Sequence, residues 1–123
     1  MVKKYDIMIP KQDYVKIEVA ILDTEGSPAK LGETDTMYFT VKRNAEAENN
    51  EFQKSLDNGI TYNEETSKYE IEIQSNDTKN MNMGDVSGVY GYDITVYYSG
   101  TKPKQKVIGK FIISDKYTLN EVV

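Results

Sequence analysis

The chain has 123 residues, of which 38% are hydrophobic and 28% are charged, and these fractions are typical of a globular protein. A net charge of −5 and a single arginine, Arg43, exclude a general affinity for nucleic acid, which needs clustered basic side chains. Cysteine and histidine are both absent, which excludes disulfides, thiolate chemistry and Ser-His catalysis. The length predicts one domain over residues 1–123.

Apolar and polar residues alternate along most of the chain, which predicts β-strands and no long helix. The predicted strands and brief strand segments cover, in chain order, residues 4–9, 15–21, 37–42, 52–56, 60–62, 69–73, 90–98 and 107–113. Clusters of turn-forming residues separate them. One short helical turn is expected over residues 76–83, with Asn76 or Asp77 as its N-cap and Gly84 as its stop. About seven short strands separated by turns predict an all-β, immunoglobulin-like β-sandwich of antiparallel strands.

The segment around Tyr90 is the most informative about the type of sandwich. Immunoglobulin-type domains often place a tyrosine near the start of the penultimate strand, where its hydroxyl bonds back to upstream backbone and closes the corner between the sheets. Tyr90 stands at that place, two residues after Gly88 and two before Tyr92. We therefore predict a structural tyrosine corner at Gly88 and Tyr90, with an ordinary core tyrosine as the alternative.

Carboxylates are the remaining candidates for catalysis. Glu70 and Glu72 lie two residues apart on one predicted strand face, where a glycosidase pair would have to flank a sugar. The alternating Tyr69, Ile71 and Ile73 claim the buried face, which leaves both glutamates in solvent. The sequence therefore predicts no catalytic residue and no enzyme.

Two loops contain residues of the types that bind calcium. Asn80, Asn82 and Asp85 lie in one loop, and Asp23 and Glu25 lie in another. Neither loop has the alternating carboxylates, central glycine and distal glutamate of an EF-hand. Asn and Asp are also common in turns because their side chains bond nearby backbone, and turn formation is the preferred interpretation. We predict no metal site and no cofactor.

Tyrosines and lysines toward the C-terminal end form the candidate interface. Tyr97, Tyr98 and Tyr117 are amphipathic, and tyrosine is enriched at binding hot spots. A carbohydrate-stacking platform and ordinary cross-strand pairs are the alternatives for these three residues. Lys102 and Lys104 belong to a lysine cluster that either contacts an anionic patch of a partner or protects a sheet edge from unwanted pairing.

Several strand and turn patterns together resemble one family. They read DTMYFTVK at 35–42, FQKSL with NGI at 52–60, KYEIEI at 68–73 followed by DTKN and MG, YDI at 92–94, and GKF with Ile113 at 109–113. These patterns resemble the immunoglobulin-like N-terminal domain of phage baseplate upper proteins, the BppU-type family of Gram-positive phages and prophages. They are packing and turn patterns and carry no catalytic signature.

The resemblance implies a non-enzymatic structural component of a phage or prophage virion. Such a component would be a tail or baseplate adaptor or an attachment module that binds other virion structural proteins in an oligomer or larger assembly. A carbohydrate- or receptor-binding β-sandwich module and a capsid decoration protein are the alternatives. The first ten residues lack a signal peptide, so the expected location is the virion after synthesis in the host cytoplasm, with no membrane insertion.

Overall fold

The structure is a computed structural model that describes residues 3–11, 13–44, 46–81, 88–99 and 103–114. The described residues form nine strands and one short 3-10 helix, so the predicted all-β class is confirmed. The strands are β1 (Lys3–Lys4), β2 (Ile7–Pro10), β3 (Val15–Val19), β4 (Thr36–Lys42), β5 (Asn50–Leu56), β6 (Gly59–Asn63), β7 (Lys68–Ile73), β8 (Val89–Tyr97) and β9 (Lys104–Ser114). The 3-10 helix is η1 (Ser75–Asp77).

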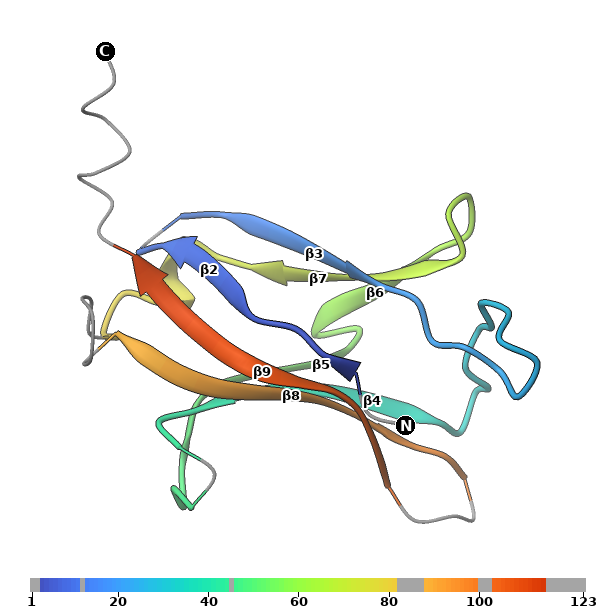
Figure 1. Cartoon of the computed structure of the whole chain (residues 1–123). Coiled ribbons are helices and arrows are strands. Elements are labelled where there is room, and N and C mark those ends of the chain that lie inside the picture. Colours follow the sequence, from blue (N-terminus) through green and yellow to red (C-terminus); the bar gives the residue numbers. More distant parts are fainter. Residues whose placement is uncertain (1–2, 12, 45, 82–87, 100–102, 115–123) are drawn as a thin grey trace.

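The nine strands belong to one mixed sheet that curls over on itself (Figure 1). The strand order is β1-β9-β8-β4-β5-β6-β7-β3, and β2 also pairs with β9. Figure 1 shows β3, β6 and β7 lying above β4, β8 and β9. The chain passes from the lower to the upper strands between β5 and β6, where Asp57 and Gly59 have positive φ angles of 64° and 102°. Glycine adopts such angles without strain, and aspartate tolerates them better than most residues.

The predicted count of about seven strands and their wholly antiparallel pairing are both wrong. The sheet has nine strands, and β1 with β9, β2 with β9, and β5 with β6 run parallel. Alternation of apolar residues identifies strands, but it does not show which strands pair or in which direction. The N-terminal segment alternates as expected, but it divides into two short strands around Tyr5 and Asp6.

The predicted helical turn is shorter and begins earlier than expected. It is the 3-10 turn Ser75–Asp77, and its N-cap is Gln74 instead of Asn76 or Asp77. The backbone N–H of Gln74 donates to the Asp77 carboxylate over 2.7 Å. Asp77 therefore stabilises the start of the turn from inside it. Gly84, the predicted stop, lies outside the described residues.

Alternate residues of the strands build the core. In β4, Met37, Phe39 and Val41 are each 0% exposed, because successive residues of a strand point to opposite faces of the sheet. The ring centroid of Phe39 lies 5.4 Å from that of Tyr92 and 6.1 Å from that of Phe111. Burying each such side chain contributes about 1.5–3 kcal/mol of stability. The residues between them in β4 consequently face away from the core. No helix within the described ranges is long and apolar enough to cross a membrane.

Candidate binding face

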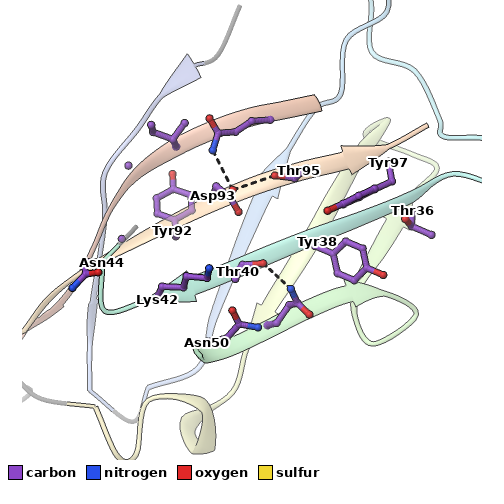
Figure 2. A pocket seen from close by; sticks show the side chains of 15 residues that line it. Thr36, Tyr38, Thr40, Lys42, Asn44, Asn50, Tyr92, Asp93, Thr95 and Tyr97 are labelled. Atoms are coloured by element: carbon purple, nitrogen blue, oxygen red, sulfur yellow. Dashed lines mark hydrogen bonds between the residues drawn. The ribbon is translucent and has the colours of Figure 1, made fainter. Parts of the chain in front are cut away.

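Residues of β5, β4, β8 and β9, most of them facing away from the core, line a shallow groove of about 870 Å³, which we call the outer face (Figure 2). It is lined by Thr36, Tyr38, Thr40, Lys42, Asn44, Asn50, Gln53, Gly91, Tyr92, Asp93, Thr95, Tyr97, Gln105, Ile108 and Gly109. Most of these side chains are polar or aromatic. The groove therefore offers hydrogen-bonding groups beside aromatic rings.

An aromatic pair marks one end of the outer face. The rings of Tyr38 and Tyr97 are 5.5 Å apart between centroids and 87° apart in plane, an edge-to-face contact (Figure 2). The two residues are diagonal neighbours across β4 and β8, because Tyr38 pairs with Thr95 and Tyr97 pairs with Thr36. Tyr97 is 45% exposed. The Tyr97 ring therefore both contacts a tyrosine of the neighbouring strand and remains open to solvent.

The polar side chains of the outer face hold one another in place. The Asp93 carboxylate accepts hydrogen bonds from the Thr95 hydroxyl over 3.2 Å and from the Gln105 amide over 3.1 Å (Figure 2). The Gln53 amide donates to the Thr40 hydroxyl over 2.9 Å. Side chains ordered before binding lose less conformational freedom when a partner arrives. Several polar side chains of the outer face are therefore already ordered in the isolated chain.

Asp35 fixes the aromatic end of the face. Its carboxylate accepts backbone hydrogen bonds from Ser99 over 2.9 Å and from Gly32 over 2.7 Å. These bonds stabilise the charged form and hold the pKa of Asp35 below its ordinary value. Asp35 thus joins the loop before β4 to the residue that follows Tyr98, and it keeps Thr36 and Tyr97 in register.

Tyr92 supports the opposite end. It is only 6% exposed, and its hydroxyl donates to the backbone carbonyl of Tyr5. Burial, helped by the negative charge of Asp6, raises the pKa of Tyr92 to about 12. A phenol that stays protonated to such a pH is neither a nucleophile nor a base at neutral pH. Tyr92 is a structural residue, as its predicted place in the core implies.

The predicted interface residues separate in the structure. Tyr97 lies on the outer face, whereas the adjacent Tyr98 points to the opposite side, packs against the core and has the Lys106 ammonium 5.1 Å from its ring centroid. Lys104 is exposed at the first residue of β9. Tyr117 and Lys102 lie outside the described residues. The structure therefore places Tyr97 and Tyr98 on different surfaces.

Tyr90 is the second residue of β8 and is 4% exposed. The guanidinium of Arg43 lies 4.8 Å from its ring centroid, a cation–π contact. The carbonyl of Gly88 accepts a hydrogen bond from the Ile113 N–H over 2.9 Å, which fixes the start of β8 against β9. Residues 85–87, the upstream backbone of a tyrosine corner, lie outside the described residues, so the corner stays a prediction.

Both glutamates of β7 have polar side-chain partners on the surface of the sheet. The Glu70 carboxylate accepts a hydrogen bond from the Asn63 amide and lies 3.5 Å from the Lys16 ammonium. Both contacts lower the pKa of Glu70, whereas a general acid needs a raised one. Glu72 accepts a hydrogen bond from the Tyr14 hydroxyl. These contacts place the pair in a surface polar network.

The two loops considered for calcium differ in how far the structure describes them. The Asp23 carboxylate accepts backbone hydrogen bonds from Glu25 over 2.9 Å and Ser27 over 3.0 Å, which is turn formation. In the other loop Asn80 is exposed, and Asn82 and Asp85 lie outside the described residues. Within the described part of the chain, no three acidic side chains converge as metal ligands would.

No protein-family model matches the chain, and no curated protein matches it. The outer face must therefore be interpreted from its own geometry. Sequence reasoning identified Tyr97 but missed Tyr38 and the polar network of Asp93, Gln105 and Gln53. Alternation along β4 already pointed Tyr38 away from the core. The missing information was the register between β4 and β8, which brings the two tyrosines together.

Proposed function

We propose that the chain is a non-enzymatic, immunoglobulin-like binding domain that holds a partner protein on its outer face. The observation that carries the proposal is the Tyr38–Tyr97 pair beside a hydrogen-bonded set of polar side chains. Tyrosine contributes a large apolar area and a hydroxyl while losing little side-chain entropy, which is why it anchors many protein interfaces. The outer face is broad and shallow, and such surfaces suit a protein partner.

The strand order supports the immunoglobulin-like assignment. Strands β9, β8, β4 and β5 are neighbours in the order of the G, F, C and C′ strands of a variable-type domain. Strands β3, β7 and β6 follow the order of its B, E and D strands. The β5–β6 passage then corresponds to the crossing from one sheet to the other. In this assignment the outer face is the exposed surface of the GFCC′ sheet.

The biological setting that we propose is a phage or prophage virion, with the chain as a tail or baseplate adaptor or attachment module. It rests on the resemblance of residues 35–42, 52–60, 68–84, 92–94 and 109–113 to the baseplate upper protein family. An assembly component needs extended contact surfaces, and the outer face supplies one. Its partners would be other virion structural proteins, and its location the assembled particle.

Mass spectrometry of purified particles tests the setting. The polypeptide should be present in intact particles and should fractionate with tails after capsids and tails are separated. Recovery with capsids would instead favour a decoration role. Absence from the particles would overturn the virion proposal and leave the binding-domain proposal to be tested separately.

Site-specific photocrosslinking tests the outer face. A photoreactive phenylalanine analogue at Tyr97 should crosslink to a second virion protein in assembled particles. The same analogue at Tyr14 is the matched control, because Tyr14 has a similar exposure, 49% against 45%, and lies just before β3, outside the lining of the outer face. Only crosslinks to a protein other than the chain itself are counted at both positions. Equal crosslinking yields from both positions would contradict a partner seated on the outer face.

A carbohydrate-binding module is the second candidate function. It is favoured by the exposed Tyr97 ring, which lines the same groove as Asp93 and Gln105, since sugars need an aromatic surface and directed hydrogen-bonding groups together. A glycan array would show hits that disappear in Tyr97→Ala. An array without hits would remove this candidate and leave protein binding.

A further inference from the structure

The free edge of β3 leaves one side of the core incompletely covered. Among the strands that the structure describes, β3 ends the strand order and pairs only with β7. Its inward residues Val15, Ile17 and Val19 are each only partly buried. Their partners on β7, Ile73, Ile71 and Tyr69, are 0–3% exposed. The neighbouring strand is thus sealed inside the core, whereas β3 is open along its outer edge.

Apolar surface gathers beside this edge. A hollow of about 1000 Å³ lies between β2 and β3, with aliphatic side chains of both strands in its lining. Five large hydrophobic side chains are exposed in the described residues, and Tyr97 belongs to the outer face. The other four lie in or next to β2 and β3: Tyr5 at 59%, Met8 at 66%, Tyr14 at 49% and Leu22 at 51%. Exposed apolar surface next to an unpaired strand edge indicates a site of association.

The charges of β3 match those of the same strand running in the opposite direction. β3 reads Val15-Lys16-Ile17-Glu18-Val19, with one charge of each sign on either side of Ile17. Glu18 lies opposite Glu70 of β7 in the register, and like charges directly opposite each other are destabilising. In the described part of the chain, no lysine forms a salt bridge with Glu18. A lysine on the open side of β3 would balance this local excess of negative charge.

We propose that β3 is a dimerisation edge, at which a second copy of the chain pairs antiparallel about Ile17. In this register Lys16 of each copy faces Glu18 of the other, Val15 faces Val19, and Ile17 faces Ile17. The strands β6, β7 and β3 then continue into the same strands of the second copy as one sheet. The interface is twofold symmetric, and the pairing uses the β3 edge of both copies, so a third copy cannot add at β3.

The self-complementary sequence is the reason for choosing a second copy over an unrelated peptide. An arbitrary extended segment could satisfy the backbone groups of β3. A strand with acid and base exchanged about its centre also places a lysine opposite Glu18, and it places a glutamate opposite Lys16, which already contacts Glu70 within its own chain. The dimer edge is separate from the outer face, so this inference does not depend on the proposed function.

Charge exchange tests the pairing. Sedimentation velocity of the wild-type chain should show a monomer–dimer equilibrium below about 1 mM, the weak limit of specific association. Lys16→Glu and Glu18→Lys should each weaken dimerisation by about tenfold or more, because each brings like charges together twice in a symmetric dimer. An equimolar mixture of the two variants should restore the dimer, because every facing pair is then opposite in sign. Lys79→Glu, at an exposed position outside the strands, is the matched control and should behave as wild type.

A cysteine scan tests the register independently of the charges. The chain has no cysteine, so each substitution introduces its only thiol. Facing residues of antiparallel strands have Cα atoms about 4.5–5.5 Å apart, within the range that a disulfide spans. Ile17→Cys should oxidise to a covalent dimer, whereas Val15→Cys and Val19→Cys should do so only when mixed with each other. Circular dichroism checks that each variant is folded.

Three outcomes would overturn the proposal. They are a wild-type chain that stays monomeric up to about 1 mM, a variant mixture that dimerises no better than its separate components, and crosslinking of Val15→Cys with itself as fast as that of Ile17→Cys. If the wild-type chain dimerises but the charge-variant mixture or the cysteine scan gives one of these results, the two copies meet at another surface.

Discussion

The hydroxyl of Tyr92 donates a hydrogen bond to the backbone carbonyl of Tyr5, which lies 87 residues earlier in the chain. The same crossing is held by the Tyr5 N–H, which donates to the Ile108 carbonyl over 3.0 Å, and by the Lys110 N–H, which donates to the Asp6 carboxylate over 2.9 Å. Three hydrogen bonds therefore hold the segment between β1 and β2 against β8 and β9.

Gly109 permits the close approach of this segment. A Cβ atom added at Gly109 would overlap the Tyr5 carbonyl oxygen, so Gly109→Ala must push the backbone at Tyr5 away from β9. We expect a loss of about 1–3 kcal/mol in the free energy of unfolding. Urea denaturation measures the loss, and amide exchange should show reduced protection at Ile7 and Ile9. Gly91→Ala is the control, since a Cβ atom there meets nothing within 4 Å. Equal effects of the two substitutions would contradict the interpretation.

Tyr92 should make stability depend on pH in the alkaline range. Its pKa is about 12 in the folded chain and near the ordinary 10.0 after unfolding, so the contribution is complete below pH 10 and is lost as the pH rises toward 12. Wild type should therefore lose up to about 2 kcal/mol more than Tyr92→Phe between about pH 9 and about pH 12. Urea midpoints across this range measure the difference. Tyr97→Phe is the control, and its urea midpoints should fall with pH as steeply as those of wild type. If the pH dependence disappeared in Tyr97→Phe and remained in Tyr92→Phe, the interpretation would be wrong.

The Lys54–Asp77 ion pair should matter to stability. The ammonium and carboxylate are 2.7 Å apart, and the two side chains are only 14% and 17% exposed. Lys54→Met should cost about 1–3 kcal/mol, because it leaves a largely buried carboxylate without its cation. Lys30→Met is the control, because Lys30 pairs with Glu64 at 2.9 Å while the side chains are 59% and 74% exposed. Thermal unfolding should show a lowered midpoint for the first variant only.

Asp35 should couple acid pH to the order of the aromatic end of the outer face. Its pKa is lowered by backbone hydrogen bonds from Ser99 and Gly32, so its contribution is present above the ordinary value of 3.8 and is lost as the pH falls through the folded value. Asp35→Ala should raise the amide exchange rates of Ser99 and Gly32 at neutral pH. It should also remove part of the acid sensitivity of folding. Unchanged exchange at both amides would show that other contacts hold the loop.

The alternation of apolar and polar residues correctly predicted which side chains of β4 and β7 face the core. Met37, Phe39 and Val41 are buried as their spacing in β4 predicts, and Ile71 and Ile73 are buried in β7. Alternation works here because each strand has one face against a common core. These positions needed no knowledge of neighbouring strands.

The pairing of strands was not contained in that pattern. Sequence reasoning treated the N-terminal residues 4–9 as one strand, but the strand is interrupted at Tyr5 and Asp6, and its two short parts both run parallel to β9. At the interruption Tyr5 closely approaches Gly109, a residue more than a hundred positions away. The outer face has the same origin, because Tyr38 and Tyr97 meet only through the β4–β8 register. Long-range register depends on the whole packed core, and single segments do not encode it.

The parallel pairing of β1 and β2 with β9 has a consequence for synthesis of the protein. Asp6 and Lys110, which join in the folded chain, are separated by 104 residues. Translation at about 5–20 residues per second leaves the N-terminal segment waiting several seconds before its partner leaves the ribosome. Until then Ile7 and Ile9 lack the strand β9 with which they pair. Their apolar side chains are exposed during this time and could promote aggregation with other nascent chains. The pairing of β1 and β2 is therefore possible only in a chain that has been translated through β9.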